Sequence, residues 1–557
     1  MSKQETKTLA KLLADCLVTR GVRYIFGIPG AKIDGLFDAL IDTPIRIILC
    51  RHEQNAVFMA AMVGRMTGKA GVVLVTSGPG VSNLVTGLLT ATTEGDPVVA
   101  LGGNVPRSMK LKESHQSTDN VRITEGATKW SVEASLAENV PEILENAFRK
   151  AESPRAGAVF VSIPQDLLLE KAVGETPIHP TRPVFGGARE ETISNIASTI
   201  SRAEKPILLL GMEASRPENT IAIRHLLEKH PLPVVSTYQA AGVISKALLP
   251  CFVGRVGLFK NQPGDQLLDE ADCIMTVGFS PVEYDPEIWN ARSPKMLIHI
   301  DYRQANLHNT YIPHLEGLGE ISLTLNELAK RLPARKTLLN RKRIQKLQKS
   351  LEEIRELTET GQGSSSSSGG SQLVRPLWFI HELKKMMDET MIISCDVGTH
   401  YMWLARYLLS HEPHQLLFSN GQQTLGVALP WAMASRLIKP NARILSVSGD
   451  GGFLFSAMEL ETAVREKIPF VHCVWNDGSY DMVRQQQRIK YGRETAVALH
   501  PIDYVAFAKS FGAVGYRIGH PKELLPTFEE AFQQKRPVII DVPIDYSDNR
   551  WLFEKAH

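Results

Sequence analysis

The most constraining feature of this chain is a pair of apolar runs that each end in glycine and acid. Ile444 to Val447 leads into Gly449-Asp450-Gly451, and Phe470 to Trp475 leads into Asn476-Asp477-Gly478. The segment between them contains a helix-like stretch, Ser456 to Lys467. This order of strand, turn, helix, strand and turn predicts a βαβ unit, in which both turns lie at the same end of a parallel sheet.

The two acids of these turns are therefore expected to lie side by side, at the edge of the sheet where ligands bind. Asp450 and Asp477, together with a main-chain carbonyl and phosphate oxygens, form the hard oxygen donor set that Mg²⁺ prefers. The flanking glycines let the backbone approach a phosphate closely. Gly-Asp-Gly alone also fits an ordinary turn. The second acid-bearing turn at this spacing, with a strand before each, favours a metal site.

Composition places the chain among ordinary globular proteins and argues against several classes. The 557 residues are 43% hydrophobic and 22% charged, and the net charge of +2 gives no reason to expect nucleic acid or an anionic membrane as a partner. No apolar stretch approaches the about 18 residues of a membrane-spanning helix, and the polar N-terminus does not fit a signal peptide. Six scattered cysteines without a Cys-x-x-Cys pattern indicate buried thiols. We expect a cytoplasmic protein.

Alternating strand and helix patterns predict an α/β protein with three doubly wound parallel-sheet domains. The first domain covers residues 1–175, and its second strand delivers Arg51-His52-Glu53 at its carboxyl end. A central α/β domain covers 186–345. A linker, 346–375, follows and overlaps a Gly/Ser-rich segment, 361–371, that is typical of a flexible connection. The third domain covers 376–557 and contains the two acidic turns.

The remaining predicted strands are short apolar runs bounded by turn residues. They are Val22 to Phe26, Arg46 to Cys50, Val72 to Thr76, Pro97 to Gly102, Ala158 to Ile163, Pro206 to Leu210, Pro233 to Ser236, Cys273 to Val277, Met296 to Ile300, Ile392 to Cys395, Leu417 to Ser419 and Val538 to Val542. The last of these is expected to close the third sheet. The central domain allows dinucleotide binding, but no Gly-x-Gly-x-x-Gly follows a strand there, so a structural domain is the preferred interpretation.

Several stretches of the chain resemble the thiamine diphosphate-dependent 2-oxoacid enzymes, and within them the acetolactate synthase family. These stretches are Phe26 to Asp34, Arg51 to Glu53, Thr76 to Gly80, His115 to Ser117, Asn420 to Trp431 and Asp545 to Asn549. The family's cofactor motif is Gly-Asp-Gly followed by Asn-Asn, and here Asp477 stands in place of the second Asn. Pro29 to Asp34 and Gly421 to Trp431 are similar to the catabolic, FAD-independent branch.

The resemblance implies a role for each residue at a matching position. Glu53 would bond the aminopyrimidine of thiamine diphosphate and assist removal of its thiazolium proton. Gln116 would face the reacting carbon, and Lys32 either attracts the pyruvate carboxylate or is a solvated surface lysine. The implied Mg²⁺ ligands are Asp450, Asp477 and the carbonyl of Ser479. The implied cofactor contacts are Gly398, Thr399, His400, Gln422, Leu425, Gly449, Gly451, Gly452 and Tyr480.

Some of these positions also fit a purely structural role. Leu425, which in the family bends the cofactor, also fits a plain core leucine. Glu53 also fits an acid at a helix N-terminus, where the helix dipole favours it. His52 and His115 stand beside functional positions, but a hydrogen-bonded structural histidine explains each of them equally well.

The activity that the resemblance implies is condensation of two pyruvates to 2-acetolactate and CO₂ through a hydroxyethyl-thiamine diphosphate intermediate, in a catabolic acetoin or butanediol route. A pyruvate decarboxylase or oxidase of the same superfamily is the alternative, and a non-enzymatic nucleotide-binding protein is the alternative from another class. The family shares each cofactor between two chains, which implies a homodimer or homotetramer.

Two further expectations concern the cofactor and the acceptor. FAD is not expected, because the segment after Cys273 to Val277 lacks the basic residues of the FAD-containing synthases. Those synthases also place a tryptophan where this chain has Gln486. An amide there suits the polar end of a small acceptor, although Gln486 also fits a solvent-facing helix position. We therefore expect pyruvate to serve as both donor and acceptor.

Overall fold

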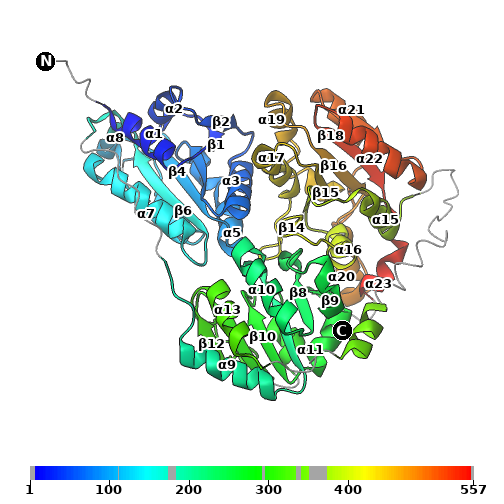
Figure 1. Ribbon diagram of the computed structural model, residues 1–557. Coiled ribbons are helices and arrows are strands. Elements are labelled where there is room, and N and C mark those ends of the chain that lie inside the picture. The colour runs from blue at the N-terminus through cyan, green and yellow to red at the C-terminus, as the bar shows by residue number, and fades with distance from the viewer. Residues whose placement is uncertain are drawn as a thin grey trace.

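The computed structural model describes residues 7–110, 112–172, 184–291, 295–333, 340–349 and 373–553. Within them the chain builds three six-stranded parallel sheets, each packed with helices, and the three sheets lie at the corners of a triangle in Figure 1. The predicted α/β class with three doubly wound sheets is confirmed. The Gly/Ser-rich segment 361–371, predicted to be a linker, lies outside the described residues.

The first sheet has the strand order β2-β1-β3-β4-β6-β5. Its strands are β1 (Tyr24–Ile28), β2 (Arg46–Leu49), β3 (Gly71–Val75), β4 (Val98–Asn104), β5 (Trp130–Glu133) and β6 (Ala158–Pro164). Its helices are α1 (Leu9–Thr19), α2 (Asp34–Leu40), α3 (Glu53–Thr67), α4 (Pro79–Ser82), α5 (Val85–Glu94), α6 (Asn120–Glu125), α7 (Val140–Glu152) and α8 (Gln165–Leu169). Every residue of β3, β4 and β6 is buried, as expected for parallel strands covered on both faces.

The central sheet has the order β12-β11-β10-β7-β8-β9, which is the order of the dinucleotide-binding fold when its strands are counted from β7. Its strands are β7 (Pro206–Leu210), β8 (Val234–Thr237), β9 (Phe252–Val256), β10 (Cys273–Val277), β11 (Met296–Asp301) and β12 (Leu315–Leu318). Its helices are α9 (Glu190–Arg202), α10 (Pro217–Lys229), α11 (Pro263–Glu270), α12 (Pro286–Asn290) and α13 (Ile321–Arg331). The chain reverses its direction of travel between β7 and β10.

The third sheet repeats the topology of the first, with the order β14-β13-β15-β16-β18-β17. Its strands are β13 (Ile392–Cys395), β14 (Leu416–Phe418), β15 (Ile444–Gly449), β16 (Val471–Asn476), β17 (Val514–Arg517) and β18 (Val538–Pro543). Its helices are α15 (Pro376–Met386), α16 (Thr399–Tyr407), α17 (Ala428–Ile438), α18 (Asp450–Phe453), α19 (Glu459–Arg465), α20 (Asp481–Tyr491), α21 (Tyr504–Ser510), α22 (Leu524–Gln533) and α23 (Arg550–Phe553). The predicted βαβ unit is confirmed, because β15 pairs in parallel with β16.

The sequence patterns missed four strands, and all four lie at sheet edges. They are β5, β9, β12 and β17. An edge strand has one neighbour and needs no continuous apolar run, and β5 and β17 are accordingly only partly buried. The prediction that Val538 to Val542 closes the third sheet is wrong, because β18 lies between β16 and the edge strand β17.

The first and third domains pack directly against each other through α3 and α17. Every residue of α17 except Arg436 and Ile438 is buried, which is typical of a helix enclosed by protein on most sides. The guanidinium of Arg65 lies over the ring of Trp431, 4.4 Å from its centroid. One apolar core therefore spans both domains and fixes their orientation.

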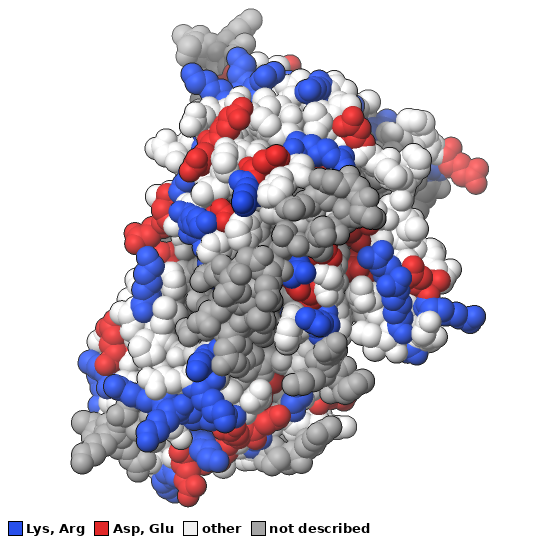
Figure 2. Space-filling view, turned by 90° about the vertical axis from the view of Figure 1, so that its right-hand side faces the viewer, with Lys and Arg blue, Asp and Glu red and all other residues white. Residues whose placement is uncertain are grey.

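The surface and the thiols match an ordinary globular chain. On the face shown in Figure 2, Lys and Arg side chains are interspersed with Asp and Glu side chains. All six cysteines are buried and free of disulfides. Among the helices in the described part of the chain, none has the length and apolar character to cross a membrane.

Candidate active site

The two predicted metal carboxylates meet at the carboxyl ends of β15 and β16. Asp450, the first residue of α18, accepts a hydrogen bond from its neighbour Gly451 N at 2.9 Å and another from Gly478 N at 2.7 Å. Since Gly478 belongs to the turn after β16, the Asp450 carboxylate ties the two turns together. Burial raises the pKa of Asp450.

Asp477 lies close enough to Asp450 for the two charges to interact. Its Oδ2 accepts the Ser479 hydroxyl at 2.5 Å and the Arg484 guanidinium at 3.1 Å. Burial first, and then the charges of Asp450 and Asp481, raise the pKa of Asp477 to about 7. Two carboxylates that are largely removed from water and repel each other form a pair that a bound cation would stabilise.

The backbone beside these acids leaves the Ser479 carbonyl free of sheet bonds. Tyr480 N donates to Val497 O at 2.9 Å, and Leu499 N donates to Gly478 O at 2.8 Å, so neither bond uses the carbonyl of Ser479. Among the described residues, no three His, Cys, Asp or Glu side chains gather in a metal-binding arrangement. The donor set that fits Mg²⁺ here has two carboxylates and one carbonyl, and it leaves the other positions to phosphate and water.

A glycine cradle lies between the turns after β13 and β15, where the third sheet reverses direction. The imidazole of His400 covers Gly398, where an added Cβ would lie 2.6 Å from the ring, and it also lies against Gly449. An added Cβ on Gly451 would lie 2.4 Å from the ring of Tyr480. Gly398 and Gly451 leave no room for a side chain, and glycine there lets the backbone approach a diphosphate closely.

The buried polar groups of the cradle also fit a phosphate ligand. Thr399 donates its hydroxyl to Asp481 at 2.7 Å. Burial lowers the pKa of His400 to about 3, and in the described structure its Nε2 is buried without a hydrogen-bond partner. A buried nitrogen of this kind costs free energy unless a ligand or water pairs with it.

Asp396 is a site residue that the sequence patterns did not single out. Its carboxylate accepts Gly426 N at 3.0 and 2.9 Å and Val397 N at 2.9 Å, and burial raises its pKa to about 7. It therefore fixes the loop that carries Leu425, which lies near Gly452. An acid directly after a buried strand and before a glycine turn is the sequence signal that points to it.

Glu53 is the first residue of α3 and is 8% exposed. Its Oε2 accepts the Asn83 amide at 2.9 Å, and its Oε1 lies near Gly80. Asn83 is a second residue that the sequence patterns missed. The preceding His52 caps the helix by accepting Gln54 N at 3.1 Å, which supports the structural interpretation of that histidine.

Gln116 joins the Glu53 side of the site. It adopts a φ of 61°, a left-handed conformation that is unusual for a residue other than glycine, and its side chain packs near Gly78. Strain of this type concentrates at functional positions. His115 is exposed.

Within one described chain, the turn before Glu53 contacts the third domain through Glu459, whose carboxylate accepts Arg51 N at 2.8 Å and His52 N at 3.1 Å. No hydrogen bond among the described residues joins Glu53, Asn83 or Gln116 to the glycine cradle. Lys32 is half-buried in the turn between β1 and α2, and its main-chain carbonyl lies against Gly103. Gln422 and Gln486 are exposed.

Comparison with known protein families matches all three sheets to one class. The N-terminal TPP binding domain of thiamine pyrophosphate enzymes matches residues 7–123, the central domain matches 193–328 and the C-terminal TPP binding domain matches 396–542. These matches and the two acidic turns define the class as the thiamine pyrophosphate enzymes.

Relatives that align with nearly the whole chain identify the family within this class. The acetolactate synthase of Bacillus subtilis (strain 168) is 49% identical over 540 residues, which cover 97% of this chain and 94% of that protein. The catabolic acetolactate synthase of Raoultella terrigena is 43% identical over 552 residues, 98% of this chain and 97% of that protein. The acetolactate synthase isozyme 2 large subunit of Escherichia coli (strain K12) is 28% identical over 97% of this chain. The chain belongs to the acetolactate synthase family.

Proposed function

We propose that this protein condenses two molecules of pyruvate to 2-acetolactate and CO₂, with thiamine diphosphate and Mg²⁺ as cofactors. The observation that carries this proposal is the paired Asp450 and Asp477 beside a glycine cradle, in a chain 49% identical to an acetolactate synthase. Thiamine diphosphate, when bound, supplies the electron sink for decarboxylation. Product identification after incubation of the purified protein with pyruvate, thiamine diphosphate and Mg²⁺ tests it.

The residues at the third sheet would hold the cofactor's charged end. Asp450, Asp477 and the Ser479 carbonyl would hold Mg²⁺. The cradle residues Gly398, Thr399, His400, Gly449, Gly451, Gly452 and Tyr480 would surround the diphosphate, with Leu425 and Gln422 on the loop beside them. Because Mg²⁺ is shared by carboxylates and phosphates, each group neutralises charge on the other.

Glu53 would hold and move a proton at the opposite end of the cofactor. Asn83 fixes one carboxylate oxygen, which leaves the other oxygen to face the cofactor's aminopyrimidine. Gln116 and Lys32 are proposed to face the substrate from the same domain. A pyruvate decarboxylase or oxidase would share these groups, and it is distinguished by releasing acetaldehyde or an oxidised product in place of 2-acetolactate.

We propose a catabolic role in acetoin or butanediol formation. The description of the Raoultella terrigena protein as catabolic supports the catabolic part of this proposal. We place the enzyme in the cytoplasm.

We propose that two chains complete each active site in a homodimer or homotetramer. Exposed apolar side chains flank the metal turns, which favours a second copy over solvent as their neighbour. They are Leu454, Phe455, Met458, Val483, Ile489 and Tyr491. Within the described part of one chain, no hydrogen bond joins Glu53 to the glycine cradle, which agrees with the same arrangement.

Mixing two inactive variants tests the shared site. Glu53→Gln and Asp450→Ala chains, unfolded together and refolded, should recover about a quarter of the wild-type activity, since half of the dimers are hybrids and each hybrid has one intact site. Refolding each variant alone is the control and should give an activity at least roughly 10²-fold below that of the wild type. No recovery in a mixture that forms hybrids would place each site within one chain.

We further propose that the enzyme works without FAD, and the central sheet supports this. Glu283 accepts Met212 N at 2.8 Å, Ser280 N at 2.9 Å and the Thr237 hydroxyl at 2.7 Å. Met212 follows β7 and Ser280 follows β10, so a buried carboxylate of the chain occupies backbone donors at the switch point where dinucleotides bind. The purified protein should lack a flavin absorption band, and a stoichiometric flavin would contradict the proposal.

We propose that pyruvate is preferred as acceptor and that Gln486 contributes. An apolar wall rewards one extra methylene by about 1–3 kcal/mol, and an amide side chain does not supply such a wall. With equal pyruvate and 2-oxobutyrate, acetolactate should therefore be at least as abundant as acetohydroxybutyrate. The matched variant Gln486→Trp should raise the acetohydroxybutyrate share. A large excess of acetohydroxybutyrate from the wild type would refute the preference.

A further inference from the structure

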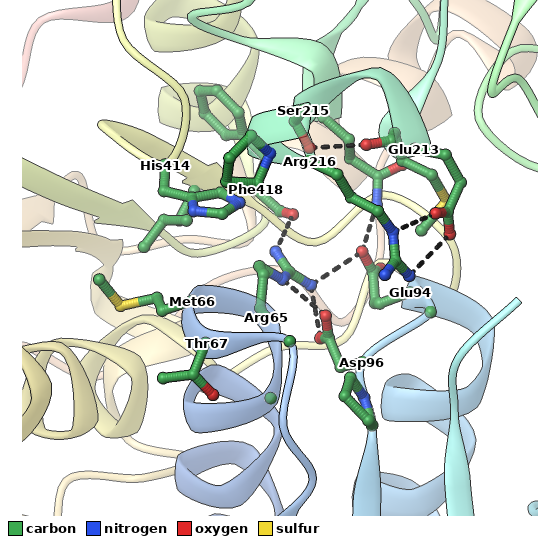
Figure 3. Close-up of a pocket in the computed structure, with 18 of the residues that line it drawn as sticks. Arg65, Met66, Thr67, Glu94, Asp96, Glu213, Ser215, Arg216, His414 and Phe418 are labelled. Carbon is green, nitrogen blue, oxygen red and sulfur yellow. Dashed lines mark hydrogen bonds and ion pairs between the residues drawn. The ribbon is translucent and has the colours of Figure 1, made fainter. Parts of the chain in front are cut away.

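The three domains meet around a cavity of about 250 Å³, whose walls include the carboxyl end of α5, the start of α10 and β14. Figure 3 shows the Arg65 guanidinium between Glu94 and Asp96 in this cavity. Arg65 donates to Asp96 at 2.9 and 2.8 Å, to Glu94 at 3.2 Å and to Phe418 O at 3.1 Å. A cation and two carboxylates of the first domain are thus anchored to the last residue of β14.

Glu94 uses its other oxygen to bind the chain that follows β14. Its Oε1 accepts the Ser419 hydroxyl at 3.1 Å, Asn420 N at 3.0 Å and Gly421 N at 2.9 Å. Glu94 is 2% exposed. Its Oε2 also accepts the amide of Gln239 in the central domain. One buried carboxylate therefore connects all three domains at the start of the loop 419–426.

Two threonines of α5 also contact the loop 419–426. The Gln422 amide donates to the Thr93 hydroxyl at 3.1 Å, and the hydroxyls of Thr90 and Thr424 lie 2.8 Å apart. Asp396 holds the far end through Gly426 N. The loop is thus fixed at both ends and along its length, and its free part presents Leu425 toward Gly452 of the cradle.

We propose that Glu94 is a positioning residue, which holds the loop 419–426 of its own chain so that Leu425 and Gln422 are placed for the cofactor. The loop's role rests on the proposed function; the hydrogen bonds do not. The first domain would then serve two active sites. Its Glu53 acts on the cofactor held by a partner chain, and its Glu94 shapes the cofactor loop of its own chain.

Glu94→Gln tests the proposal with a side chain of the same size. The variant loses the charge that faces Arg65, and an amide group cannot accept every donor that converges on the carboxylate. Unpaired donors of this kind change equilibria by about 10- to 100-fold. We expect faster amide hydrogen exchange in 419–426, affinity for thiamine diphosphate with Mg²⁺ lowered by about 10- to 100-fold in calorimetry, and a lower kcat with a nearly unchanged KM for pyruvate.

Arg216→Met is the matched control, because Arg216 lines the same cavity but pairs with Glu213 of its own domain. This variant should leave amide hydrogen exchange in the loop 419–426 and the affinity for thiamine diphosphate at wild-type values.

If Glu94→Gln does not fold, Thr93→Val provides a second test. It removes one hydrogen bond to the loop and should shift both measurements in the same direction as Glu94→Gln, by a smaller factor. Wild-type exchange and affinity in a folded Glu94→Gln or Thr93→Val protein would overturn the proposal. Absence of acetolactate from the wild type would instead refute the proposed activity, while the exchange measurement would still test Glu94.

Discussion

Replacing Glu53 by glutamine should lower kcat by at least the roughly 10²–10⁴-fold that a positioned proton transfer contributes. Glutamine has the same shape and can still accept the Asn83 amide at the position of Oε2, so the fold and cofactor binding should persist. What is lost is a group that holds and returns a proton at the aminopyrimidine. Steady-state turnover, together with calorimetric binding of thiamine diphosphate, measures both quantities.

Two further variants sharpen this test. Asn83→Ala should reduce kcat by a smaller factor, since it frees the Glu53 carboxylate without removing it. Glu125→Gln, at the exposed end of α6, should behave as wild type. Near-normal turnover in Glu53→Gln would show that the carboxylate is not the proton-handling group.

Asp450→Ala is expected to abolish retention of thiamine diphosphate, and Asp477→Ala should do the same. Each removes a carboxylate that would share Mg²⁺ with the diphosphate, which leaves negative charge uncompensated. Asp450→Ala also removes the acceptor of Gly478 N, so the two metal turns lose their connection. In the wild type, thiamine diphosphate with Mg²⁺ should raise the thermal midpoint, because a ligand that binds the folded state stabilises it.

The variant Asp450→Asn separates the charge from the hydrogen bond. Its side-chain oxygen can still accept Gly478 N, but it offers no negative charge to the metal. If the negative charge is what retains the cofactor, Asp450→Asn should resemble Asp450→Ala. The thermal midpoint of unfolding should then not rise in either variant when thiamine diphosphate and Mg²⁺ are added. Unchanged calorimetric affinity in Asp450→Ala and Asp477→Ala would rule out the metal role.

Apolar runs and turn residues were enough to locate the inner strands and the acidic turns. β7, β10 and β13 were predicted at their observed bounds, because a strand buried on both faces must be apolar along its length. The turns of Asp450 and Asp477 were predicted to meet, since parallel strands joined by a helix end at the same edge. The family also followed from these local motifs, and the comparisons confirm it.

The residues that hold Glu53 and the loop 419–426 in place became visible after the domains were seen packed together. Asn83 lies 30 positions from Glu53, and Glu94 lies 325 positions from Ser419. Neither separation in sequence reflects the repeat of a helix or of a strand, so no periodic pattern points to these pairs. Two of the missed edge strands, β5 and β17, are only partly buried, so no continuous apolar run marks them in the sequence. The local sequence pattern indicates which backbone conformation a segment favours. A contact between distant segments forms only when the helices and sheets pack together.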